Sequence, residues 1–115
     1  MRAKHFEDVI AWQKARELTL RIYAIFKGHR DFDFKDQIQR ASVSIMNNIA
    51  EGFERDGDKE KRRFFFMSKG SAGEVRSMLY LAKDLETISE EDFKYCHNTC
   101  LEISRIMGAF IRHLS

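Results

Sequence analysis

The chain has 115 residues and a mass of 13.6 kDa, the size of one ordinary domain, which we expect to span residues 1–115. Its 43% of hydrophobic and 33% of charged residues exclude an intrinsically disordered chain and a membrane-spanning one. Twenty basic and eighteen acidic residues give a net charge of +2. The overall charge therefore does not by itself support nucleic-acid binding, although it does not exclude a local basic patch.

The compartment can be predicted from three features of the sequence. The first residues are polar and lack the apolar run of a secretory signal. No stretch approaches the ~18 apolar residues of a transmembrane helix, and two cysteines do not make a disulfide framework. We expect a cytoplasmic protein with reduced thiols and no membrane contact.

The first predicted helix runs from about Asp8 to Lys27. Apolar residues recur along it at steps of three and four, which indicates one buried face: Ala11, Ala15, Leu18, Ile22 and Ile25. A second, partly aromatic group lies away from that face: Val9, Trp12, Arg16, Leu20 and Tyr23. An amphipathic second face with a tryptophan is typical of an oligomer contact. We assign Trp12, Arg16 and Tyr23 to such a contact.

The second predicted helix runs from about Phe34 to Arg55, with Asp33 as its N-cap. Its buried stripe consists of mostly large apolar residues: Ile38, Ser42, Ile45, Met46, Ile49 and Phe53. The opposite face has short polar side chains flanked by charged ones: Gln37, Arg40, Ser44, Asn48, Glu51 and Arg55. This face is either an ordinary solvated surface or a polar network at a subunit contact. Catalysis would need more than Glu51, the only useful titrating group here.

The third predicted helix runs from about Lys59 to Glu86, with Asp58 as a cap. One face is apolar: Phe64, Ala72, Val75, Leu79 and Ala82. On the other side, aromatic residues alternate with basic and small ones, a pattern suited either to packing against a neighbouring subunit or to contact with nucleic acid. For nucleic acid, the candidate phosphate and stacking contacts are Lys59, Arg62, Arg63, Lys69, Phe66 and Tyr80.

The fourth predicted helix starts after Ser89, which with Asp92 has the spacing of a capping box. Its apolar stripe alternates at steps of three and four: Phe93, Cys96, Cys100, Ile103, Met107, Phe110 and Leu114. Four amphipathic helices with short connections favour antiparallel neighbours. We therefore predict an all-α fold, an antiparallel up-down-up-down four-helix bundle.

No motif in the sequence predicts an enzyme, a cofactor or a metal site. The two cysteines occupy core positions, where buried and inert thiols are expected. The residues around Gly70 lack the spacing and the lysine of a phosphate-binding loop, and they fall in mid-helix. The sequence also lacks the paired Glu-x-x-His ligands of a di-iron bundle.

Several segments resemble one bacterial family. The sequence SIMNNIAEG at residues 44–52 is similar to the signature of the four-helix bundle proteins encoded in 23S rRNA intervening sequences. Supporting segments lie in family order: IAWQKA at 10–15, QIQRA at 37–41 and FFMSKGSAGE at 65–74. The sequence departs from the family in lacking proline after the first helix and in its near-neutral charge.

The resemblance implies a homopentamer of four-helix bundles whose cellular role is largely unknown. It also implies kinship with the accessory variability proteins of diversity-generating retroelements, which bind nucleic acid and associate with a reverse transcriptase. We therefore expect a non-catalytic homo-oligomer that contacts RNA, DNA or a nucleoprotein partner such as a reverse transcriptase. The alternative is an oligomeric protein–protein adaptor that binds no nucleic acid.

Overall fold

A computed structural model describes residues 3–114, so the ends of the predicted domain at residues 1 and 115 lie outside the described part. A short 3-10 helix, η1 (Phe6–Asp8), precedes four α-helices: α1 (Ile10–Ile25), α2 (Phe32–Glu54), α3 (Asp58–Asp84) and α4 (Glu90–His113). No strand is present between residues 3 and 114. The all-helical prediction is confirmed, with α1 shorter at both ends than expected.

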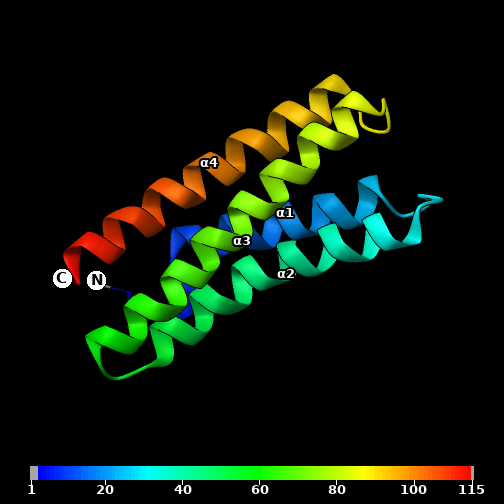
Figure 1. The fold of residues 1–115 in the computed structure, drawn as a ribbon. Helices are drawn as coiled ribbons and strands as arrows, with labels where there is room; N and C mark the ends of the chain where they lie inside the picture. Colours follow the sequence, from blue (N-terminus) through cyan, green and yellow to red (C-terminus); the bar gives the residue numbers. More distant parts are fainter. Residues whose placement is uncertain (1–2, 115) are drawn as a thin grey trace.

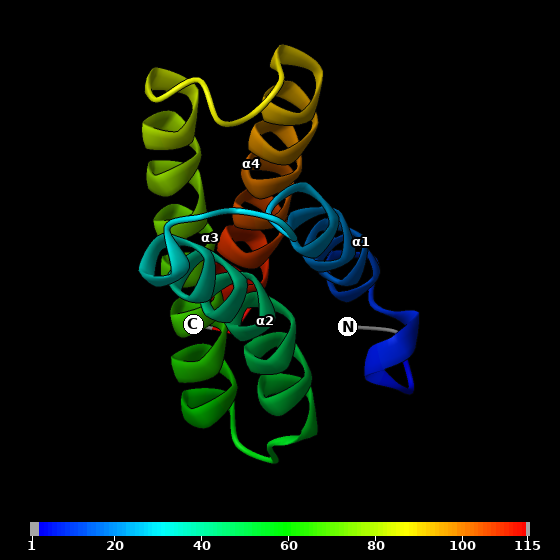
Figure 2. The ribbon, with the colours of Figure 1, turned by 90° about the vertical axis from the view of Figure 1, so that its right-hand side faces the viewer.

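The helices form an antiparallel bundle of about 43 × 21 × 20 Å (Figure 1). Each helix packs on the next one in the chain, and α1 also packs on α4, which closes the bundle. The direction alternates along the chain, as an up-down-up-down bundle requires. Figures 1 and 2 show that the turn joining α1 and α2 lies apart from the turn joining α3 and α4.

Side-chain caps fix two of the helix starts. The Oδ1 atom of Asp31 accepts a hydrogen bond from the backbone N–H of Phe34 at 3.1 Å, so Asp31 is the N-cap of α2 and the prediction of Asp33 was wrong. Asp31 has the extended backbone that an N-cap needs, whereas Asp33 already lies in the first turn. The predicted cap Ser89 is confirmed, because its Oγ accepts from the N–H of Asp92 at 3.1 Å.

The start of α3 differs from the prediction. Gly57 is its N-cap and makes no side-chain cap bond, while Asp58 is the first residue of the helix rather than its cap. A carboxylate in the first turn still faces the positive end of the helix dipole and stabilises it.

The core follows the predicted stripes, although five predicted members are only partly buried and pack against its edge: Ile25, Met46, Phe53, Phe110 and Leu114. Two further residues differ from the prediction. Phe65, rather than Phe64, is the fully buried ring of α3. The reason is register: Phe65 lies seven residues before the buried Ala72, and two helical turns bring it back to the same face. Val9, predicted on the outer face, is only 4% exposed because the chain packs it inward between η1 and α1.

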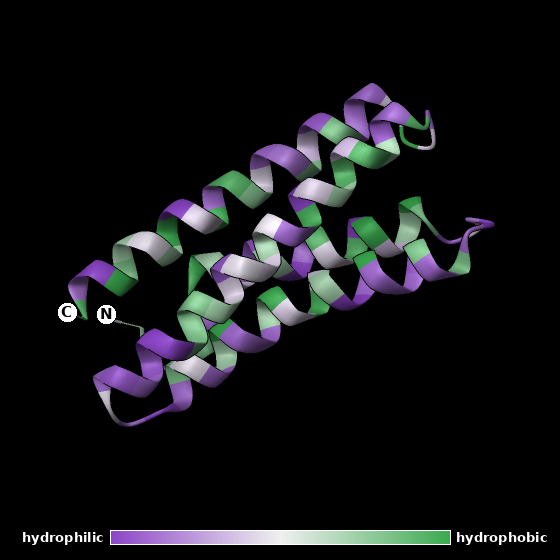
Figure 3. Cartoon of the chain, in the orientation of Figure 1, coloured by the Kyte–Doolittle hydropathy of each residue, from purple (hydrophilic) through white to green (hydrophobic). Residues whose placement is uncertain are grey.

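Hydrophobic and hydrophilic residues alternate along every helix (Figure 3). Across the described residues 3–114, no helix combines the length and the apolar character needed to cross a membrane.

Candidate nucleic-acid interface

One side of α3 carries cations and aromatic rings in alternation. We call it the α3 stripe, and its members follow one another at steps of four and three: Arg62, Phe66, Lys69, Gly73, Arg76, Tyr80 and Lys83. This spacing matches the 3.6-residue helical repeat, so the residues share one side of the helix. The cations recur every seventh residue, which corresponds to a rise of about 10 Å along the helix axis.

The aromatic members of the stripe are exposed to solvent. Phe66 has 55% of its surface exposed and Tyr80 has 49%. Large aromatic side chains are usually buried, so two exposed rings on one helix side indicate a contact surface. Lys69 and Lys83 are also exposed, whereas Arg62 and Arg76 are half-buried.

The stripe borders α4, and a glycine there lets a cation lie close to that helix. A Cβ atom on Gly108 would lie 3.9 Å from Cε of Lys69 and 3.4 Å from Nη1 of Arg112. The two positive side chains therefore lie beside the same point of α4. Further along the stripe, burial raises the pKa of the Cys100 thiol to about 12, and the positive charge of Arg76 acts in the opposite direction.

Several carboxylates of these helices are paired with other residues. Glu74 accepts a hydrogen bond from Gln37 of α2 at 3.5 Å. Two acids of α4 pair with α1 at 2.8 Å each, Glu102 with Lys14 and Asp92 with Arg21. Within residues 3–114, no carboxylate oxygen lies within 4.0 Å of a cation of the α3 stripe. The stripe is therefore a local basic surface in a nearly neutral protein.

Tyr80 belongs to a cluster of aromatic rings shared with α4. Its hydroxyl is hydrogen-bonded to Nε2 of His97 at 2.9 Å, and its ring meets that of Phe93 edge-on at 5.4 Å. The rings of Phe93 and His97 are stacked 5.3 Å apart. The Nζ atom of Lys83 lies 4.6 Å from the centre of the Phe93 ring. The cluster fixes the position of the exposed tyrosine and sets a cation next to it.

The structure divides the six residues predicted to contact nucleic acid. Arg62, Phe66, Lys69 and Tyr80 lie together on the stripe. Arg63 lies apart from it, pairing with Glu60 at 3.3 Å and packing its guanidinium over Phe64. Lys59 is exposed in the first turn of α3, before the stripe begins.

The sequence analysis missed three residues of this surface, Arg76, Lys83 and His97. A seven-residue period of cations from Arg62 would have identified the first two. The signal for His97 is weaker, because its place beside Tyr80 depends on the packing of α4 against α3.

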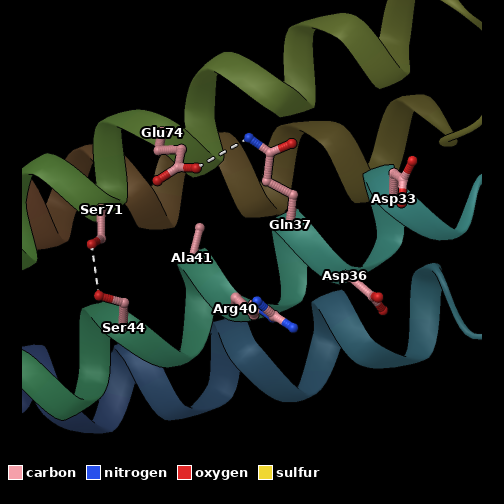
Figure 4. A pocket seen from close by; sticks show the side chains of 8 residues that line it. All are labelled: Asp33, Asp36, Gln37, Arg40, Ala41, Ser44, Ser71 and Glu74. Atoms are coloured by element: carbon pink, nitrogen blue, oxygen red, sulfur yellow. Dashed lines mark hydrogen bonds between the residues drawn. The ribbon is translucent and has the colours of Figure 1, made fainter.

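The polar face of α2 is connected to α3 by hydrogen bonds within the chain (Figure 4). The hydroxyls of Ser44 and Ser71 lie 2.9 Å apart, and Nδ2 of Asn48 donates to Oγ of Ser44 at 2.9 Å. Arg55 pairs with Glu51 at 2.8 Å, one turn apart. These bonds account for part of the predicted polar network, while its role at a subunit contact stays a prediction.

Shallow hollows lie on both sides of this polar face. One, of about 490 Å³, is lined mainly by polar residues of α2 and α3: Asp33, Asp36, Gln37, Arg40, Ala41, Ser44, Ser71 and Glu74 (Figure 4). The other, of about 400 Å³, adds Tyr23 of α1. Arg40 and Ser44 line both hollows, so they stand on the ridge between them.

The outer face of α1 has both packed and exposed aromatic groups. Trp12 meets the ring of Phe6 edge-on at 5.1 Å, and the guanidinium of Arg16 lies 5.7 Å from the Trp12 ring centre. Tyr23 and Leu20 are 44% and 64% exposed. The tryptophan is thus held by η1, while the second half of α1 offers apolar surface.

Neither cysteine has the character of a nucleophile. Burial raises the pKa of Cys96 and of Cys100 to about 12, so both thiols stay protonated at neutral pH. Within the part of the chain described, His, Cys, Asp and Glu side chains form no group of three or more suited to a metal ion.

Comparison with known proteins identifies relatives of this fold. The family described as 23S rRNA-intervening sequence protein matches residues 7–109. A crystal structure of a protein of unknown function from the S23 ribosomal protein family of Bacteroides thetaiotaomicron is similar, with 23% identity and a TM-score of 0.84. The similarity covers 90% of this chain and 99% of that one. Among curated proteins, none matches the chain.

Proposed function

This chain belongs to the family of 23S rRNA-intervening sequence proteins, and from that premise we propose that it is a non-catalytic protein that contacts RNA through the α3 stripe. The observation that carries the proposal is the line of four cations without a carboxylate partner, Arg62, Lys69, Arg76 and Lys83. Phosphate groups are the natural partners of such a line, because basic side chains that neutralise phosphates release bound counterions.

The proposal predicts binding that depends steeply on salt. For single strands, each phosphate contact contributes about −0.7 to the slope of log affinity against log salt, so four contacts give about −3. A fluorescence-anisotropy titration of labelled RNA at several salt concentrations measures this slope. An affinity that does not change with salt, or no binding even at low salt, would contradict the proposal.

Matched variants locate the contact on α3. Lys69→Gln and Arg76→Gln each remove one cation of the stripe, and each should weaken binding and reduce the slope by about 0.7. Lys27→Gln removes an exposed cation in the turn after α1, away from the stripe, and should change neither quantity. Equal loss in all three variants would indicate a general charge effect rather than a site.

We also propose that the protein is a homo-oligomer, with the pentamer implied by the family resemblance as the expected state. Support comes from large apolar side chains that the single chain leaves exposed off the α3 stripe, among them Leu20 at 64% and Ile10 at 62%. Light scattering gives the mass. Asn48→Leu tests the polar face of α2, because it removes an amide from that face and should change the mass or the stability of the assembly.

The adaptor alternative makes a different prediction for the same variants. If the α3 stripe packs against a neighbouring subunit, Lys69→Gln alters the mass of the assembly and no RNA binds. From the family resemblance we also propose that the assembly has a reverse transcriptase or another nucleoprotein as its partner. Co-purification of the chain with a candidate enzyme tests this proposal.

A further inference from the structure

We propose that the α3 stripe takes a single strand of RNA rather than a duplex, with one base stacked on Tyr80 and another on Phe66. The inference rests on the proposed function and adds the class of RNA to it. In a duplex the faces of internal bases are covered by their neighbours. Rings exposed between phosphate-binding cations can therefore stack only with bases of an unpaired strand.

The order of residues along the stripe fits an alternation of phosphate and base contacts. Each ring stands between two cations, Phe66 between Arg62 and Lys69, and Tyr80 between Arg76 and Lys83. Midway between the rings is Gly73, where a Cβ atom would meet nothing within 4 Å. The middle of the stripe is thus open, and a strand can cross it close to the helix backbone.

Tyr80 is the stronger of the two stacking positions because its ring is already held in place. The hydrogen bond to His97 at 2.9 Å fixes the hydroxyl, and the edge-on contact with Phe93 fixes the ring. A ring that is ordered before binding loses little entropy when a base stacks on it. His97 is accordingly a positioning residue for this base site.

The length of the stripe predicts the length of strand that it takes. From Arg62 to Lys83 the helix rises about 30 Å, at 1.5 Å per residue. A stacked strand advances about 3.4 Å per nucleotide, so the stripe spans about nine nucleotides. Affinity should therefore rise with oligonucleotide length up to about nine nucleotides per site and then level off.

Anisotropy titrations of the full chain with oligoadenylates of about 4, 8 and 12 nucleotides, and with a 12-base-pair RNA duplex, test the inference. We expect the 12-nucleotide strand to bind at least tenfold more tightly than the duplex. Tyr80→Leu and Phe66→Leu keep apolar bulk and remove the aromatic face. Each should weaken single-strand binding about tenfold and leave the salt slope unchanged, because no phosphate contact is lost.

Phe32→Leu is the matched control. Phe32 is 67% exposed at the start of α2, off the stripe and beside a lysine, so its loss should not affect binding. Circular dichroism shows whether each variant is folded, and two independent ring variants keep the test decisive if one of them is not.

The outcomes separate the inference from the proposed function. Duplex binding as tight as single-strand binding, or ring variants that bind like the wild type, would overturn the single-strand inference and leave RNA binding through the stripe intact. Failure to bind any of these RNAs would overturn both.

Discussion

Helix α3 meets α2 along one side and α4 along the other, and the two contacts differ in how the cations of α3 are paired. Toward α2, the polar groups are paired within the fold: Oγ of Ser68 donates to the carbonyl of Ile45 at 2.8 Å, and Nζ of Lys61 donates to the carbonyl of Phe53 at 2.8 Å. Toward α4, the cations of the stripe have no carboxylate partner among residues 3–114. Cations that are not paired with a carboxylate inside the fold are the ones available to bind an anionic ligand.

Glycines show the same contrast in packing. At Gly52 of α2, a Cβ atom would lie 2.7 Å from Cε1 of Phe65, so only glycine permits this approach of α2 and α3. At Gly73 of the stripe, nothing in the chain lies within 4 Å of that position. One glycine is required by the core, whereas the other faces space that a partner can occupy.

Two neighbouring phenylalanines test this contrast with the largest expected effect. Phe65→Ala removes a fully buried ring and should lower the free energy of unfolding by about 4 kcal/mol. Phe66→Ala removes an exposed ring and should change it by less than about 0.5 kcal/mol. Urea unfolding at one protein concentration measures both, since assembly couples stability to concentration. A comparable loss at Phe66 would show that the stripe is buried in the assembly.

Gly52→Ala tests the tight side of α3. The added methyl group must displace the ring of Phe65, and overpacking of this kind costs about 2 kcal/mol. Helix propensity alone predicts the opposite sign, because alanine favours a helix more than glycine does. Thermal unfolding measured by circular dichroism shows whether overpacking or helix propensity determines the stability of the variant. A more stable variant would show that α2 and α3 have room for a methyl group at residue 52.

The thiols of α4 give a pH-dependent test of the core that lies beneath the basic surface. The pKa of Cys96 and of Cys100 is raised by burial from 9.0 to about 12, so the unfolded chain loses these protons first. Their contribution to stability is complete below pH 9 and is lost as the pH rises from about 9 toward 12. At pH 10 the loss is about 1 kcal/mol per thiol.

Urea unfolding between pH 8 and 10 measures this loss. Cys100→Ala should show about half of the pH-dependent decrease, although its stability at pH 8 is lower because a buried group is gone. A wild-type stability that stays constant up to pH 10 would contradict the assignment of both thiols to a dry core.

Gly73→Ala tests the open side of α3, and its expected effect is small. With no neighbour to displace, alanine should stabilise the helix by about 0.7 kcal/mol. Thermal unfolding should show a lower melting temperature for Gly52→Ala and a higher one for Gly73→Ala than for the wild type, if α3 is closely packed at Gly52 and open at Gly73. Destabilisation at Gly73 would indicate that a second copy of the chain already packs closely against the stripe.

The helices and the bundle could be predicted from the sequence because each helix carries its own periodic apolar stripe. The choice between Phe64 and Phe65 was also open to sequence reasoning, because Phe65 and not Phe64 lies seven residues before Ala72 on the apolar face, and the packing of Phe65 against Gly52 agrees with that register. The sequence does not decide the start of α2, where Asp31 and Asp33 both have the chemistry of an N-cap.

Half of the candidate site was also accessible to sequence reasoning. The exposed rings and the cations Arg62 and Lys69 were found from helical spacing. The net charge of +2 concealed the rest, because acids such as Glu102 and Asp92 offset the cations in the count but pair with α1 in the fold. Which charges are already paired is a property of the tertiary structure.

The three consecutive cations at residues 61–63 face different surroundings. Lys61 binds the last carbonyls of α2, where its charge faces the negative end of that helix, Arg62 begins the stripe, and Arg63 turns to Glu60. Each step along the helix is a rotation of 100°. One residue inserted between Arg63 and Phe65 would therefore rotate every later cation by 100° relative to Arg62, although every existing side chain would be kept. The angular phase of α3, set by the anchoring of Phe65 and Lys61 on α2, thus determines which way the line of cations faces.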